Sequence, residues 1–135
     1  MMRYLPDTNV WIRHLSPGPS PVKERIRACQ LHEITLCDVV KAELYYGAYR
    51  STRRVDNLTT LSTLFAGLDS LPFDGAAAKV FGAIRADLEQ KGTPIGPYDL
   101  QIASIAMANQ CIVVTHNTRE FSRIDGLKLE DWETL

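Results

Sequence analysis

The sequence has few cysteines and histidines, no long apolar run and almost no net charge. Its three cysteines and three histidines show neither a CxxC pair nor the spacing of a zinc site, so we expect free thiols in a reducing, cytoplasmic setting. No apolar run approaches the roughly 20 residues that cross a bilayer, and the N-terminus lacks the pattern of a secretory signal. These absences argue against a disulfide framework, a zinc site and a membrane span.

The totals are those of an ordinary globular protein. The 135 residues are 45% hydrophobic and 23% charged, which fits a single domain spanning 1–135. The net charge of −1 neither supports nor excludes a polyanionic partner. Basic clusters can bind phosphates on such a protein, although a solvated helix face is the commoner explanation. The clustered arginines are Arg50, Arg53 and Arg54, with Arg119 and Arg123 nearer the end.

The stretch Tyr4-Leu5-Pro6-Asp7-Thr8-Asn9-Val10 carries an acid between two apolar runs, 1–5 and the one that starts at Trp11. A short apolar run bounded by proline and polar residues predicts a buried strand, a loop and then a helix. Functional groups in open α/β sheets gather where parallel strands end. Asp7 is therefore a candidate functional acid, and helix capping is an equally good explanation of it.

Glu43 lies in the predicted helix 39–49, within a largely apolar stretch. Val39, Glu43 and Tyr46 share one face of that helix by their spacing. A carboxylate among apolar neighbours is costly to desolvate unless it is paired or binds a cation. A residue at the edge of the buried face that reaches solvent is the alternative. Tyr45, Tyr46 and Tyr49 form an aromatic group that we expect in the core or an interface.

Asp99 follows two prolines and a glycine that lead into the predicted helix 97–109. The small residues Ala103 and Ala106 let that helix pack closely on a sheet. A carboxylate in the first helical turn is also stabilised by the helix dipole, so a structural role is again possible. The run Cys111–Thr115 is the clearest strand of the sequence, since it is short and rich in β-branched residues. It ends directly before the polar group His116-Asn117-Thr118.

Predicted strands near residues 3, 34, 71, 112 and 128 alternate with predicted helices at 9–15, 21–29, 39–49, 55–68, 75–91 and 97–109. This alternation predicts a three-layer α/β domain whose short-stranded, mainly parallel sheet is flanked by helices. The carboxylates of Asp7, Glu43 and Asp99 can then converge at one edge, with Asn117 or Glu120. Such like charges repel one another unless a cation joins them, and oxygen ligands suit Mg²⁺ or Mn²⁺.

The sequence resembles the PIN-domain ribonucleases, and among them the VapC toxins of bacterial toxin–antitoxin modules. The matching segments occur in the family's order along nearly the whole chain. They are Asp7-Thr8-Asn9, Ala42–Gly47, Leu71–Asp74, Ile84–Leu88, Pro94–Ala103 and Val114–Phe121. Each short segment is a weak signal, whereas the ordered set is quite specific.

The resemblance implies a Mg²⁺-dependent endoribonuclease, active as a homodimer and neutralised by a cognate VapB-type antitoxin. Asp7, Glu43 and Asp99 match the family's acidic metal ligands. Asn117 stands at a fourth position that is often an acid, which leaves Asn117 or Glu120 to complete the shell. Two further departures are Pro6, where an aliphatic residue is usual, and Cys37-Asp38, where small hydroxyl residues are common.

The resemblance also makes RNA the expected substrate, including structured RNA such as tRNA, with Arg50, Arg53, Arg54 and Arg119 as candidates to bind its backbone. An antitoxin would insert an arginine among the acids and place apolar side chains along Trp11, Ile12 and Leu15. Of these three we expect Ile12 and Leu15, more than Trp11, to be buried in the core.

Two other functions remain open from the sequence. A phosphatase with an aspartyl nucleophile usually has a second acid two residues after the first, and position 9 is Asn. A catalytically inactive PIN-like module used only for protein binding is the other alternative, and retention of all three acids argues against it. A dinucleotide-binding module is excluded because the first turn is not rich in glycine.

Overall fold

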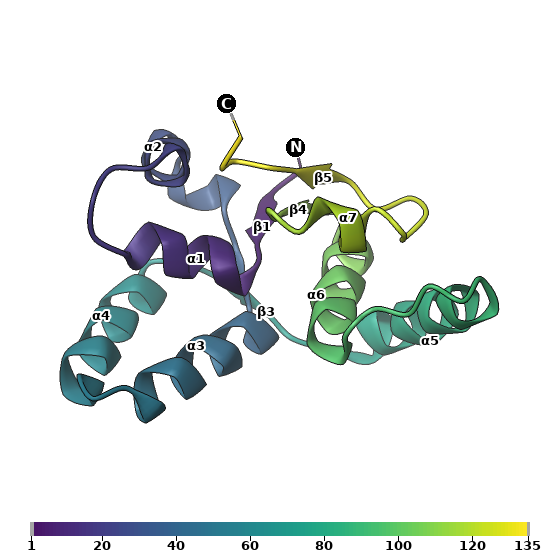
Figure 1. Cartoon of the computed structure of the whole chain (residues 1–135), viewed down its shortest axis with the longest axis horizontal. Coiled ribbons are helices and arrows are strands. Elements are labelled where there is room, and N and C mark those ends of the chain that lie inside the picture. Colours follow the sequence, from purple (N-terminus) through teal and green to yellow (C-terminus); the bar gives the residue numbers. More distant parts are fainter. Residues whose placement is uncertain (1, 135) are drawn as a thin grey trace.

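The structure, a computed structural model, describes residues 2–134, and within them short parallel strands form the centre of the molecule (Figure 1). Strands β1, β4 and β5 form one sheet in the order β1-β4-β5, and β2 pairs with β3. A parallel bridge between Tyr4 and Ile34 joins the two sheets along β1. The strands are β1 (Tyr4–Pro6), β2 (Leu36–Cys37), β3 (Ser70–Leu71), β4 (Ile112–Val114) and β5 (Leu129–Glu130).

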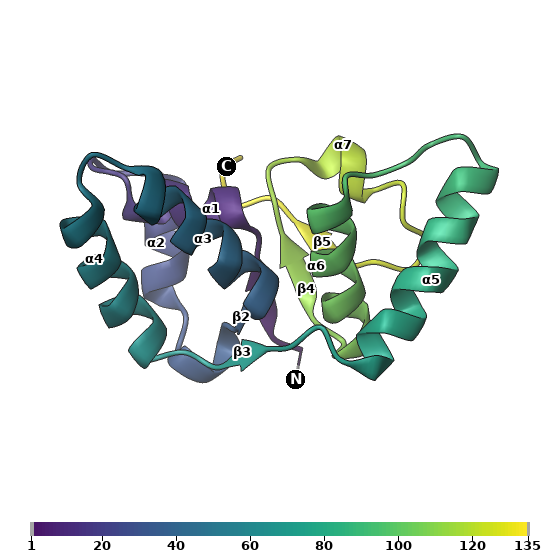
Figure 2. The ribbon, with the colours of Figure 1, turned by 90° about the horizontal axis from the view of Figure 1, so that it is seen from below.

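Helices cover both sides of the strands, as Figure 2 shows. Helices α1 to α4 lie on one side, and α5 and α6 on the other. The helices are α1 (Thr8–Leu15), α2 (Pro21–Ala28), α3 (Asp38–Arg50), α4 (Arg54–Ala66), α5 (Gly75–Gln90), α6 (Pro97–Ala108) and α7 (Thr118–Phe121), with the short 3₁₀ helix η1 (Leu31–Glu33). The expected three-layer α/β fold with a parallel sheet is confirmed. No helix among residues 2–134 is long and apolar enough to cross a membrane.

Local sequence signals explain several helix ends. The Ser20 side chain accepts from the Lys23 amide, with Pro21 at the first helical position of α2. Asp74 caps α5 in the same way, through the Ala77 amide. Gly92 follows the end of α5 with a φ of 71°, which a residue without a Cβ adopts without strain.

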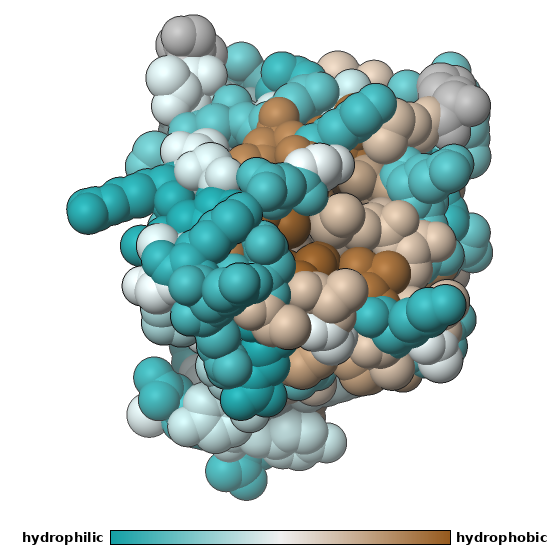
Figure 3. Space-filling model, turned by 90° about the vertical axis from the view of Figure 1, so that its right-hand side faces the viewer, coloured by the Kyte–Doolittle hydropathy of each residue, from teal (hydrophilic) through white to brown (hydrophobic). Residues whose placement is uncertain are grey.

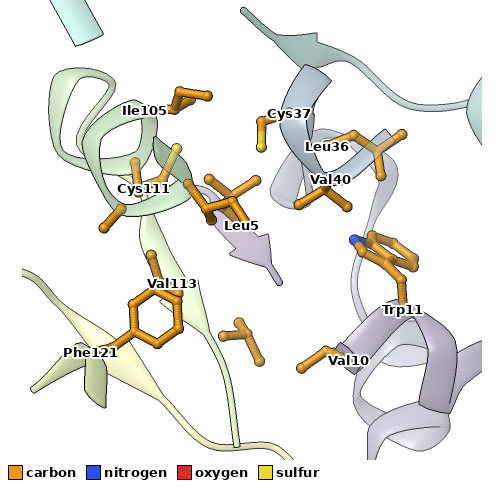
Figure 4. Close-up of a cluster of buried hydrophobic side chains, with 14 of the residues drawn as sticks. Leu5, Val10, Trp11, Leu36, Cys37, Val40, Ile105, Cys111, Val113 and Phe121 are labelled. Atoms are coloured by element: carbon orange, nitrogen blue, oxygen red, sulfur yellow. The ribbon is translucent and has the colours of Figure 1, made fainter. Parts of the chain in front are cut away.

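One apolar core joins the strands to the helices on both sides (Figure 4). Leu5 of β1 and Val113 of β4 lie at its centre and are fully buried. The core side chains labelled around them include Val10, Trp11, Leu36, Val40, Ile105 and Phe121. Packing of this kind holds the ends of β1 and β4 together, and the Asp7 amide donates a 2.9 Å hydrogen bond to the Val114 carbonyl.

Two strand boundaries expected from the sequence need correction. The strand expected at 33–36 begins at Leu36, because residues 31–33 form η1, where the Glu33 side chain accepts from the Gln30 amide. The last strand is β5 at Leu129–Glu130 rather than 127–129, because Leu127 closes a turn by donating to the Ile124 carbonyl. Helix α7 was not expected. Met1, in the first apolar run, lies outside the described residues.

The expected burial on α1 was wrong. Trp11 is 1% exposed, whereas Ile12 is 49% exposed and Leu15 36% exposed. The reason is that α1 packs against the core through Val10 and Trp11. Ile12, the residue after Trp11, therefore points away from the core and into solvent. The tyrosines Tyr45, Tyr46 and Tyr49 of α3 are likewise exposed rather than in the core.

Candidate active site

Asp7 lies at the carboxyl end of β1 and begins α1. Its Oδ1 accepts a 3.0 Å hydrogen bond from the Val10 amide, so the residue does cap the helix. Its side chain is buried, and burial raises the pKa of this carboxyl, with smaller raising contributions from Glu43 and Glu133. Hydrogen bonds from Thr115 and the Val10 amide act in the opposite direction. Capping and a functional role are therefore compatible in Asp7.

Glu43 lies in the middle of α3 and is half-buried. The Thr8 hydroxyl donates a 2.6 Å hydrogen bond to its Oε1. Because Thr8 belongs to the first turn of α1, this bond fixes the Glu43 carboxylate toward the residue that follows Asp7. The apolar stretch around Glu43 thus holds a carboxylate that faces the end of β1.

Asp99 lies in the first turn of α6, after the rigid approach through Gly96 and Pro97. Burial raises the pKa of its carboxyl to about 6, and the charges of Glu120, Asp7 and Glu43 add to the shift. Four carboxylates from four separate segments, those of Asp99, Glu120, Asp7 and Glu43, are therefore close enough for their charges to act on Asp99. Like charges so placed oppose folding when no cation neutralises them.

Asn117 and Glu120 belong to α7 and its start. The Asn117 amide nitrogen donates to Glu120 Oε2 at 3.2 Å, and the Gly96 backbone N–H donates to Glu120 Oε1 at the same distance. Both Glu120 oxygens are therefore engaged, and the side chain links α7 to the loop that leads to Asp99. The side-chain nitrogen of Asn117 is used in this contact, which leaves its side-chain oxygen free to bind a metal ion. Of Asn117 and Glu120, Asn117 is therefore the more available ligand.

Three further side chains of this region were not predicted from the sequence. Thr8 holds Glu43 by a hydrogen bond, and Thr115 lowers the pKa of Asp7. Both residues belong to or adjoin the sequence motifs of the site, but nothing in the sequence indicates which side chains they contact. Glu133 raises the pKa of Asp7 and lies 3.8 Å from Arg13 in an ion pair. No sequence pattern indicated Glu133, because the tail packs beside α1 only through the tertiary fold.

The donor chemistry of the cluster fits a hard divalent cation, since all the candidate ligands are oxygen atoms. Among residues 2–134, however, no three His, Cys, Asp or Glu side chains are arranged to hold one ion together. Mg²⁺ is commonly bound through one or two carboxylates while it keeps several waters. The arrangement therefore fits an ion held by a pair of carboxylates and by water better than one enclosed by four side chains.

The candidate RNA-binding arginines fall into two places. Arg50, Arg53 and Arg54 lie at the corner between α3 and α4, about two helical turns beyond Glu43. Arg53 pairs with Asp56 at 3.3 Å, and Arg54 Nε donates to the Tyr49 carbonyl at 2.7 Å. Arg119 is exposed on α7, two residues after Asn117.

Comparison with known proteins assigns the chain to a known class. Residues 4–127 match the model of the PIN domain family. The tRNA(fMet)-specific endonuclease VapC of Shigella flexneri is 39% identical over 132 residues, which cover 98% of this chain and 99% of that protein. The protein of the same name from Salmonella typhimurium is 38% identical over the same shares of the two chains.

Solved structures agree with these relatives. The DNA-bound VapBC structure from Salmonella typhimurium matches with a TM-score of 0.90 and 38% identity, covering 98% of this chain and 99% of that one. VapBC2 from Rickettsia felis, bound to a DNA fragment from its promoter, matches with a TM-score of 0.87 and 33% identity, covering 97% and 99%. The chain belongs to the VapC ribonucleases of the PIN-domain family.

Proposed function

We propose that this VapC ribonuclease is a Mg²⁺-dependent endoribonuclease toxin, with Mn²⁺ as a substitute, that cleaves cellular RNA and so inhibits translation and growth. The observation that carries the proposal is the convergence of Asp7, Glu43 and Asp99 at one edge of the sheet, where burial, and then the charges of Glu120 and of the other two acids, raise the pKa of Asp99 to about 6. A polyanionic substrate approaches such an acidic site only with a cation between them.

In this proposal Asp7 and Asp99 hold the ion, Glu43 binds it through a water, and Asn117 or Glu120 completes the shell. The bound ion supplies a water of lowered pKa and neutralises charge on the phosphate under attack. The other residues orient these groups. Thr8 holds Glu43, and Glu120 holds the Asn117 amide. Each bond limits the positions that its carboxylate or amide can take, which favours one reactive geometry.

A structured RNA is the proposed substrate, because the two relatives at 39% and 38% identity are named as tRNA(fMet)-specific endonucleases. We propose tRNA as the substrate class of this chain as well. Arg50, Arg53, Arg54 and Arg119 are the proposed contacts to its backbone. The first three lie at the corner between α3 and α4, and Arg119 lies on α7, two residues after Asn117.

We propose a VapB-type antitoxin as the protein partner, because solved VapBC complexes match nearly the whole chain. Its apolar anchors would lie along Ile12 and Leu15, which are exposed and line a cleft of about 350 Å³ between α1, α3 and α4. Glu43 also lines this cleft. An arginine is the suited residue to enter the acid cluster from there, because it pairs bidentately with carboxylates and keeps its charge.

We also propose that two copies pair through the outer face of α5. Figure 3 shows a broad apolar surface on this side of the molecule. Small residues make up much of the exposed face of α5 and permit close approach of a second helix, namely Gly75, Ala76, Ala78, Gly82, Ala83 and Ala86. Sedimentation should show a dimer that Ala83→Glu converts to a monomer, and a monomeric wild-type protein would refute this pairing.

Cleavage of total cellular RNA, with mapping of the ends, tests the proposed activity. We expect cuts that require Mg²⁺, stop on addition of EDTA and are lost in Asp7→Asn, Glu43→Gln and Asp99→Asn while the fold is retained. Calorimetric titration with Mg²⁺ then separates an active enzyme from an inactive PIN-like module. If one of the three variants kept wild-type turnover at saturating Mg²⁺, that residue would not be a ligand.

A further inference from the structure

A second cleft, of about 600 Å³, opens between α3 and α6 and has Glu43 in its wall. Its volume falls within the roughly 300–1,000 Å³ typical of ligand sites. The lining side chains come from one face of α3 and from the first turns of α6, the two helices that flank the strands in Figure 2. The cleft is therefore continuous with the candidate active site, because it shares Glu43 with the acid cluster.

Two tyrosine rings line this cleft and are largely exposed. Tyr46 of α3 is 65% exposed, and Tyr98 of α6 is 59% exposed. The Arg50 guanidinium lies 5.5 Å from the centroid of the Tyr46 ring, so one face of the ring is already covered by a cation. This contact restrains the Tyr46 ring and leaves it as a flat apolar platform toward the cleft, where Val39 and Ala42 add further apolar surface.

The charge of the cleft decides what kind of group fits beside these rings. Asp38 and Glu43 both line it, so a phosphate is repelled, whereas a flat uncharged group is not. Asp38 is held in place, because its Oδ1 accepts a 2.6 Å hydrogen bond from the Ser70 hydroxyl. Its second oxygen can accept from a ligand, and the Gln101 amide can both donate and accept. The lining thus offers ring faces together with acceptors for an amino group.

We propose that this cleft binds one nucleobase of the RNA next to the bond that is cut, stacked on Tyr46 and Tyr98, with its amino edge on Asp38. The inference rests on the proposed ribonuclease activity, since it names the part of the substrate that occupies the surface beside the acids. Stacking alone tolerates every base. The carboxylate of Asp38 adds a preference for guanine, adenine and cytosine over uracil, which has no amino group.

Fluorescence of 2-aminopurine tests the stacking directly. A short RNA carries this base at one position at a time next to the mapped cut, and binding is measured with Ca²⁺ in place of Mg²⁺, so that a divalent cation is present at the acidic site while cleavage is suppressed. We expect quenching at one position and its loss in Tyr46→Leu and Tyr98→Leu, with affinity reduced roughly 5- to 100-fold, as expected when one base–aromatic stack is removed. Tyr49→Leu is the matched control, because Tyr49 is an exposed tyrosine of the same helix outside the cleft.

Base preference gives an independent measurement. In Asp38→Asn the side-chain oxygen that accepts from Ser70 is retained, while an amide donor replaces the second carboxylate oxygen. We expect uracil at the stacked position to be cleaved nearly as fast as the other bases in this variant and more slowly than them in the wild type. Equal cleavage of all four bases by the wild type would overturn the role of Asp38.

The outcomes separate this inference from the activity on which it rests. If the wild type cleaves RNA but the two leucine variants keep wild-type quenching and affinity, the nucleobase site is refuted and the ribonuclease stands. If the wild type cleaves no RNA, the proposed activity fails; 2-aminopurine is then placed at each position of the RNA in turn, and quenching that is lost in Tyr46→Leu and Tyr98→Leu still decides the binding site. If the leucine variants keep quenching but lose dimerisation in sedimentation, the cleft is a contact between two copies and the proposal is wrong.

Discussion

The hydroxyl of Thr8 donates a 2.6 Å hydrogen bond to the carboxylate of Glu43, and so joins the first turn of α1 to the middle of α3. The two residues are 35 positions apart in the sequence. The bond orients Glu43 and satisfies one of its oxygens. A proposed metal-site acid is thus held by a neighbour that carries no charge of its own.

Replacing Thr8 by valine should slow RNA cleavage while the protein stays folded. Valine has nearly the same shape but no hydroxyl, so Glu43 loses a hydrogen bond whose removal is expected to cost about 1–2 kcal/mol, or roughly 5- to 30-fold in kcat. Thr8→Ser keeps the hydroxyl and should keep most of the activity. A wild-type kcat for Thr8→Val at saturating Mg²⁺ would show that the bond does not orient a reacting group.

The stability of the metal-free protein should fall as the pH rises from 4 to 7. The pKa of Asp99 rises from 3.8 to about 6 on folding, chiefly through burial. The folded state therefore binds this proton more tightly, and the resulting stabilisation is complete below about pH 4 and lost as the pH passes 6. Buried Asp7 has its pKa shifted in the same direction.

Thermal melting in EDTA across this pH range measures the effect. The melting temperature of Asp99→Asn should increasingly exceed that of the wild type as the pH rises. Asp125→Asn is a suitable control, because Lys91 lowers the pKa of the Asp125 carboxyl, so no such widening is expected. Added Mg²⁺ should raise the wild-type melting temperature at pH 7 more than at pH 5, because protons compete for Asp99. If the melting temperatures of the wild type and Asp99→Asn differed by the same amount at every pH, the raised pKa of Asp99 would be contradicted.

Replacing Arg53 and Arg54 by glutamine should weaken RNA binding and flatten its dependence on salt. Each phosphate that the protein no longer neutralises lowers the slope of log K against log salt by about one unit. Arg85→Gln is the matched control, since Arg85 is exposed and paired with a nearby carboxylate on its own helix, as Arg53 is. An unchanged slope would assign the α3–α4 corner to solubility or to the antitoxin.

Antitoxin binding should depend on Ile12 and Asp7 together. Ile12→Ala removes an exposed apolar contact, and Asp7→Ala removes a carboxylate available to an entering arginine, so each variant should weaken the complex and the double variant should weaken it further. Val55→Ala, an exposed apolar residue of α4 outside the cleft, should bind as the wild type does. Full-strength binding by the double variant would show that the antitoxin docks elsewhere. Trp11 is unsuitable for this test, because truncating a buried tryptophan costs about 3–5 kcal/mol of stability.

The alternation of strands and helices could be predicted from the sequence because the longer helices carry local signals, whereas the four-residue helix α7 carries none that was recognised. Ser20-Pro21, Asp74 and Gly92 mark ends by local hydrogen bonding or by a positive φ. The strands were predicted less well. They are two or three residues long, so turns such as η1 decide their bounds, and turn closure depends on side chains like Glu33.

For the candidate site, the acids were predictable and their supports were not. Asp7, Glu43 and Asp99 each stand out against apolar neighbours in the sequence. Glu133 and the Thr8–Glu43 bond depend on how segments far apart in the chain pack together. The burial of Trp11 and the exposure of Ile12 also depend on tertiary packing. Val10, Trp11 and Ile12 are consecutive apolar residues, so the sequence alone does not indicate which of them face the core.

The order of strands has a consequence for when the enzyme can act during its own synthesis. Strand β1, which leads into Asp7, pairs along its length with β4 through the register Tyr4 with Ile112. A ribosome has therefore made more than one hundred residues before the neighbour of β1 exists, and Asp99 emerges almost as late. The nascent chain holds its acids apart until translation is nearly finished. A ribonuclease built in this order has no complete acid cluster while most of its chain is still being made.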